Sequence, residues 1–138
     1  MNALVLALAL ALGAPASVPD LSGLEPAVAA QIAEMRTLGS PGDLGQVYLA
    51  YGFNDAAADS FRAAAALAPG DPRWPYLLGA ADLAAGRLDD AAAAFTRALE
   101  MSPGAAAGWV HLGEIRLLQG RPEEAEAALR KAVQAGLS

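Results

Sequence analysis

The chain of 138 residues contains no cysteine and a single histidine. Without cysteine it can form no disulfide framework, no thiol nucleophile and no cysteine-ligated zinc site. Basic residues are also few, 9 against 15 acids, and the resulting net charge of −6 argues against the basic surface that binds nucleic acid. We therefore expect a non-enzymatic protein with no cofactor, no metal site and no nucleic-acid partner.

The few residues that could support chemistry have simpler explanations. His111 and Glu114 are three residues apart, a spacing found in helical metal sites, but a metal would need further ligands from other helices. The acidic pairs at 89–90 and 123–124 stand at expected helix starts, where carboxylates stabilise the positive end of the helix dipole. We interpret all of them as structural or solvated groups.

The amino-terminal segment is apolar from Ala3 to Leu12 and has no charged side chain. Small residues follow in Ala14-Pro15-Ala16, at the positions that signal peptidase inspects. We expect a signal peptide over residues 1–16, cut after Ala16, and a periplasmic or secreted mature chain. The alternative is an uncleaved anchor, but the apolar run is too short for a stable span of about 30 Å of hydrocarbon.

A linker is expected over 17–24 and a helix over 25–38, where Val28, Ile32 and Met35 follow helical spacing. From about residue 38 onward, six sets of positions recur with a period of 34 residues, in one register and over three cycles. The repeated positions are Leu44-Gly45, Leu78-Gly79 and Leu112-Gly113; Leu49, Leu83 and Leu117; Gly52, Gly86 and Gly120; Ala57, Ala91 and Ala125; Phe61, Phe95 and Leu129; and Ala64, Ala98 and Ala132.

Each set has a physical role in a unit of two helices of about 12 to 14 residues joined by short turns. The glycines at 45, 79 and 113 remove a side chain where the two helices cross closely. The glycines at 52, 86 and 120 stand where the first helix ends, a position that favours a left-handed backbone. The repeat therefore predicts three helix–turn–helix units.

The pattern resembles the tetratricopeptide repeat over residues 38 to 138. The segment from Trp109 to Gly113 matches the start of the family motif in the third unit, and Phe61 to Ala64 and Phe95 to Ala98 match its end in the first two. Proline replaces the family's tryptophan at 41 and 75, and Asp82 and Arg116 replace its tyrosine. The resemblance implies an all-α fold, an αα-hairpin solenoid wound as a right-handed superhelix.

The expected domain covers residues 25–138, with an extra helix over 25–38 and units at about 38–71, 72–105 and 106–138. In the family, ligands lie along the concave face built from the first helix of each unit. Transferring those offsets gives eight candidate partner-binding residues. They are Gln46, Ala50, Arg73, Tyr76, Ala80, Ala84, Val110 and Glu114.

This candidate face is mostly small and apolar, with Tyr76 as an aromatic anchor and Arg73 as a charge. Such a groove suits a helix or an extended segment with apolar side chains. The alternative is that Tyr76 only packs against the next unit. We therefore expect an exported scaffold that binds a protein or peptide through the concave face.

A competing hypothesis is a structural module that self-associates or docks onto a larger envelope assembly without a peptide groove. The last unit leaves apolar residues on its outer side that a neighbouring repeat would cover. They include some of Trp109, Leu112, Leu117, Leu118, Ala128 and Val133. We expect either concentration-dependent self-association through this unit or a partner that covers it.

Overall fold

The computed structural model describes residues 17–136, which contain seven α-helices and no strand. The expected signal peptide lies outside the described residues. No helix in the described part of the chain has both the length and the apolar character needed to cross a bilayer. The helices are α2 (Pro26–Leu38), α3 (Pro41–Ala50), α4 (Asn54–Leu67), α5 (Arg73–Ala84), α6 (Leu88–Met101), α7 (Ala106–Leu118) and α8 (Pro122–Gly136).

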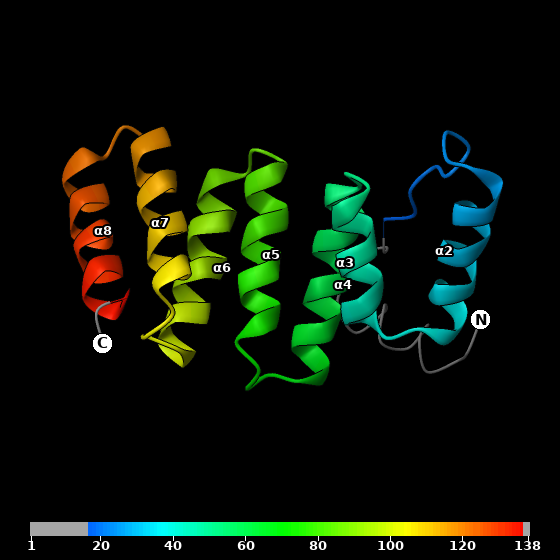
Figure 1. Ribbon diagram of the computed structural model, residues 1–138, viewed down its shortest axis with the longest axis horizontal. Coiled ribbons are helices and arrows are strands. Elements are labelled where there is room, and N and C mark those ends of the chain that lie inside the picture. Colours follow the sequence, from blue (N-terminus) through cyan, green and yellow to red (C-terminus); the bar gives the residue numbers. More distant parts are fainter. Residues whose placement is uncertain (1–16, 137–138) are drawn as a thin grey trace.

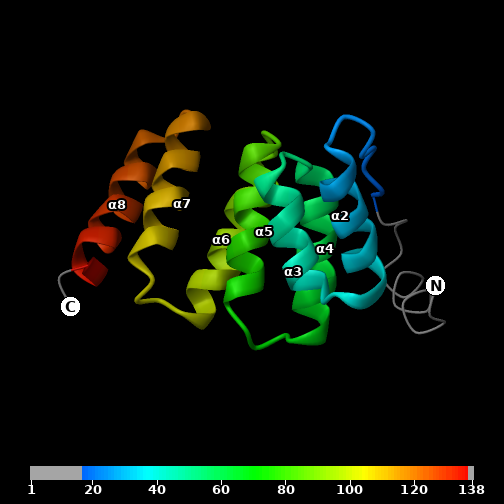
Figure 2. The same cartoon turned by 45° about the vertical axis from the view of Figure 1, so that its right-hand side comes forward.

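The helices follow one another along the molecule in chain order, because each one packs mainly against its neighbours in the sequence (Figure 1). In the turned view, α2 lies at one end of the row and α8 at the other (Figure 2). The predicted all-α helical solenoid is therefore confirmed. The second helices of the three hairpins, α4, α6 and α8, begin at Asn54, Leu88 and Pro122, which are 34 residues apart.

The turns inside the three hairpins share one backbone geometry. Gly52, Gly86 and Gly120 have φ angles of 78°, 77° and 73°, and no other described residue has a positive φ. In the second hairpin the N–H of Arg87 donates to the carbonyl of Asp82 at 2.9 Å, which satisfies a carbonyl at the end of α5. The predicted left-handed helix ends are confirmed.

The predicted close crossings are also present. A Cβ atom on Gly45 would lie 2.7 Å from the ring of Phe61, and one on Gly113 would lie 2.9 Å from Leu129. Because the missing side chain leaves room for these large residues, the two helices of a hairpin can approach closely. Phe61 is fully buried and lies at the centre of the first core cluster.

Trp74, on the first turn of α5, fills the space between two hairpins. Its ring stacks on Phe61 with a centroid separation of 6.5 Å and lies directly over Gly42 of α3. A second core cluster surrounds Phe95 and includes Leu112 and Ile115 of α7. Apolar packing therefore continues across the junctions between hairpins.

Asp82, at the position of the family's tyrosine, is a buried charge with 1% of its surface exposed. Its carboxylate accepts a hydrogen bond from Nε of Arg87 at 2.9 Å, forms an ion pair with Nη2 of Arg87 at 2.8 Å, and lies 3.8 Å from the guanidinium of Arg62 on α4. Arg87 also pairs with Asp55 of α4, and this bond together with Asp82 raises the pKa of Arg87. The replacement of tyrosine thus creates a polar link between the first and second hairpins.

Candidate binding surfaces

The eight candidate residues lie on the first helices of the hairpins, α3, α5 and α7, and we call their surface the A-helix face. None of the eight is buried: Tyr76 and Ala80 are half-buried and the other six are exposed. They are therefore accessible to a partner, although no contact in the structure assigns them a binding role.

Three of the eight residues, Gln46, Arg73 and Tyr76, line a pocket of about 380 Å³. The end of α6 and the start of α7 supply other parts of its wall, including Leu99 and Gly108. The other five candidates lie outside this pocket. Sequence reasoning missed two apolar residues of α5 that also line it, Trp74 and Leu77.

Tyr76 has both a packing contact and an accessible edge. Its ring meets Phe95 edge-on at 5.3 Å between centroids and lies 5.8 Å from His111. His111 in turn stacks on Phe95 at 5.1 Å. Tyr76 therefore packs on Phe95 within its own hairpin and on His111 of the next hairpin, while it also forms part of the pocket wall.

His111 and Glu114 do not form a metal centre with other residues. The Nδ1 atom of His111 lies 3.6 Å from the carboxylate of Glu114, and this nitrogen makes no hydrogen bond. Among residues 17–136 no group of three or more histidine, aspartate or glutamate side chains could hold a metal ion.

The charge of Arg73 is matched within its own segment. Its guanidinium donates to both carboxylate oxygens of Asp71, at distances from 2.7 to 3.1 Å, and these bonds lower the pKa of Asp71. The same guanidinium lies 4.9 Å from the centroid of the Trp74 ring. Arg73 therefore forms a fixed rim of the pocket rather than a free cation.

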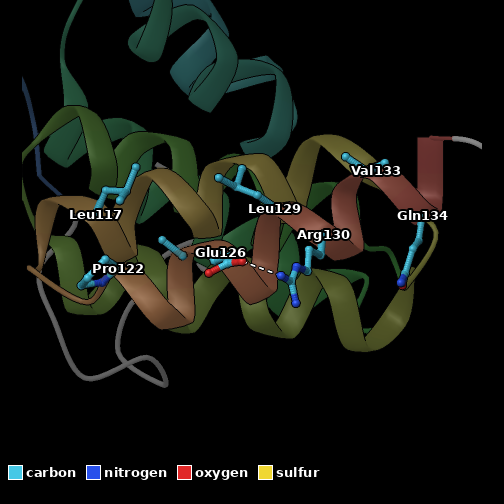
Figure 3. Close-up of a pocket in the computed structure, with 8 residues that line it drawn as sticks. Leu117, Pro122, Glu126, Leu129, Arg130, Val133 and Gln134 are labelled. Atoms are coloured by element: carbon cyan, nitrogen blue, oxygen red, sulfur yellow. Dashed lines mark hydrogen bonds and ion pairs between the residues drawn. The ribbon is translucent and has the colours of Figure 1, made fainter.

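A second hollow lies on the outer side of the last hairpin, and we call it the C-terminal groove (Figure 3). Its volume is about 530 Å³. Leu117, Leu129 and Val133 lie along one side, and a more polar row lies along the other. The residues that line the groove are Leu117, Pro122, Ala125, Glu126, Leu129, Arg130, Val133 and Gln134.

Solved structures with the same fold include two groups of proteins. A crystal structure of MamA is 21% identical, with a TM-score of 0.70 over 79% of this chain and 66% of that one. MamA from Desulfovibrio magneticus RS-1 is 23% identical, with a TM-score of 0.70 over 78% of this chain and 62% of that one. This chain thus spans less than two thirds of either MamA chain.

The second group is the type III secretion chaperone SycD of Yersinia enterocolitica, solved in complex with a peptide of the translocator YopD. It is 27% identical, with a TM-score of 0.68 over 72% of this chain and 76% of that one. No curated protein matches the sequence. The tetratricopeptide-repeat family model matches residues 43–104 and 76–136, so the chain belongs to the tetratricopeptide-repeat family.

Proposed function

We propose that this protein is an exported, non-enzymatic scaffold that binds a protein or peptide partner through the A-helix face. The pocket that joins Gln46, Tyr76 and Leu77 is the observation that carries the proposal. It offers an amide, an aromatic edge and an aliphatic side chain at one place, which is the mixture that recognises a peptide with apolar side chains.

The likeness to SycD supports a peptide as the partner. That protein was solved with a peptide of its translocator, and the two chains share 27% identity over most of their lengths. We propose the same class of ligand here.

A photo-crosslinking residue at position 46 of the exported chain tests this proposal, since Gln46 is exposed and lines the pocket. We expect a discrete crosslinked partner in the cell envelope and none from the same crosslinker at Tyr51, which is exposed but lies outside the pocket. Tyr76→Ala in the crosslinking chain is expected to remove the product, whereas Tyr51→Ala in that chain is expected to preserve it.

The Tyr76 result needs a fold control, because this ring packs on Phe95. Helical circular dichroism of Tyr76→Ala is expected to match that of the parent chain. Loss of the helical signal would show that Tyr76 is a core residue and that the site assignment is wrong. Equal crosslinking at 46 and 51 would show that the pocket is not the binding site.

A second candidate function is a docking or self-associating module without a peptide groove. The observation that favours it is the exposure of Leu117 and Val133, at 57% and 61%, in the C-terminal groove. Exposed apolar surface of this kind drives association at about 25 cal/mol per Å² buried. Sedimentation over a wide concentration range distinguishes a self-associating chain from a monomeric chain that binds a different protein.

A further inference from the structure

The C-terminal groove continues the surface on which the first hairpin receives the second. Two periods of the repeat relate Leu117 and Leu129 of the groove to Leu49 and Phe61 of the first hairpin. Those two residues pack in one core cluster with Trp74 and other residues of α5. The groove therefore corresponds, two repeats later, to the surface of the first hairpin that α5 covers.

The helix α4 holds α5 with two charged residues as well as with apolar packing. Arg62 lies 3.8 Å from the carboxylate of Asp82 on α5, and Asp55 pairs with Arg87, which follows the end of α5. The bound segment thus carries an aspartate near the end of its helix and, beyond the left-handed turn at Gly86, an arginine five residues later. The helix that binds this segment, α4, carries the complementary charges on Asp55 and Arg62, which are seven residues apart.

The helix α8 repeats both of these charged positions. Arg130 stands where α4 has Arg62, and Glu123 stands where it has Asp55. The intervening helix α6 does not repeat the basic position, which is Thr96 there. Charge and apolar register therefore agree that the outer side of α8 resembles the side of α4 that binds α5.

The two charges on α8 are accessible. Glu123 is exposed and has no ion-pair partner among residues 17–136. Arg130 pairs with Glu126 of its own helix at 2.5 Å. Such a pair does not prevent a second contact, because Arg62 likewise holds Asp59 of its own helix at 2.9 Å while it reaches α5.

We propose that the C-terminal groove docks a segment of a partner protein with the pattern of residues 73–87, which is an amphipathic helix with an aspartate near its end and an arginine five residues after that aspartate, beyond a left-handed turn. The aspartate pairs with Arg130, the arginine pairs with Glu123, and the apolar face of the helix covers Leu117 and Val133. This surface lies apart from the A-helix face, so the inference does not depend on peptide binding there.

Docking is expected to be reversible, unlike the packing of α5. Glu126 occupies the register position of Ala58, which is fully buried in the core cluster that includes residues of α5. A docked helix must cover part of this carboxylate or displace it, and removing a charged group from water opposes binding. The groove therefore suits a partner that associates and leaves.

The probe is a fluorescent peptide with the sequence of residues 71–88, stabilised as a helix only over 73–84 so that the turn at Gly86 can form. It is titrated into the full chain and followed by anisotropy. We expect saturable binding that Val133→Glu weakens by about tenfold or more, which corresponds to about 1.4 kcal/mol or more. Leu118→Glu is the matched control, because Leu118 is also 61% exposed but lies outside the groove. The affinity of the Leu118→Glu chain for the peptide is expected to equal that of the parent chain.

Charge reversal distinguishes docking through the two ion pairs from nonspecific hydrophobic association. A peptide with Asp82→Arg and Arg87→Asp is expected to bind the parent chain about tenfold more weakly. The chain with Glu123→Arg and Arg130→Glu is expected to restore its binding. Absence of saturable binding, or equal affinity of both peptides for the parent chain, overturns the proposal. So does concentration-dependent dimerisation of the chain that Val133→Glu abolishes, because a second copy then occupies the groove.

Discussion

The missing side chain of Gly79 makes room for the ring of Phe95. A Cβ atom on Gly79 would lie 2.8 Å from Cδ2 of this fully buried ring, closer than nonbonded carbon atoms approach. The contact holds α5 and α6 together, and the same relationship recurs between Gly45 and Phe61 in the first hairpin. One glycine in each unit thus determines how closely the two helices pack.

We predict that Gly79→Ala destabilises the protein although alanine is the better helix former. The propensity gain is about 1 kcal/mol, whereas forcing a methyl group against a buried ring costs about 1–3 kcal/mol. The net loss is expected to be about 1 kcal/mol, measured as a lower midpoint in urea. Gly104→Ala is the control, because no atom lies within 4 Å of its Cβ position, and an equal effect of both changes would contradict the packing argument.

The buried link around Asp82 gives a second prediction. Asp82→Asn leaves Arg87 without its charged partner on α5, and breaking buried pairs costs about 3–5 kcal/mol. Because Arg87 keeps Asp55 and is partly exposed, we expect a smaller cost than this, about 2–3 kcal/mol by urea unfolding. Asp90→Asn, at an exposed position with no ion pair in the described part of the chain, is expected to cost less than about 1 kcal/mol.

The repeat predicted features that depend on one residue and its local backbone, such as the left-handed Gly86 and the crossing at Gly79. It did not predict the role of Asp82, because this position is Tyr48 and Arg116 in the other two units, and Arg62 meets Asp82 only after α4 and α5 pack. A position that differs between the repeats, such as Asp82, therefore takes part in interactions that the repeat pattern alone does not predict.

The candidate site was predicted in part for a similar reason. Offsets along the first helices identify accessible positions, and three of these line the pocket. Its depth depends on how the end of α6 meets the start of α7, which places Leu99 and Gly108 in the wall. The position of Trp74 could not be predicted from the offsets, because it depends on how α5 packs against α3. The ring lies over Gly42 of the neighbouring hairpin.

Asp71 and Arg73 give a prediction on pH. The hydrogen bonds from Arg73 lower the pKa of Asp71 from its usual value of 3.8, so the ion pair forms above that value and is lost as the pH falls through the lowered pKa. In an NMR titration the carboxyl of Asp71 is expected to titrate below 3.8, and Arg73→Gln is expected to raise its midpoint. An unchanged midpoint in Arg73→Gln would show that Arg73 is free to serve a partner.

The proposed export predicts a defined processed product. Intact-mass analysis of the exported chain is expected to give a protein that starts at Ser17, because Ala14 and Ala16 provide the small residues that signal peptidase requires. Ala16→Leu is expected to block processing and to leave the longer chain with the membrane. Recovery of the unprocessed parent chain from the membrane would contradict the proposal.

Cleavage after Ala16 would also change a contact that the structure contains. The backbone N–H of Ser17 donates to the carboxylate of Asp59 at 2.7 Å, and the Ser17 hydroxyl donates to the same oxygen at 2.6 Å. Processing converts this N–H into an α-ammonium group, so the hydrogen bond gains a charge. We predict that a chain starting at Ser17 is more stable than the full chain by up to about 1 kcal/mol at low salt. Urea unfolding of both chains measures this difference in stability. Asp59→Asn is expected to remove the difference, because the asparagine amide carries no charge. A difference in stability that survives Asp59→Asn or high salt would contradict the prediction.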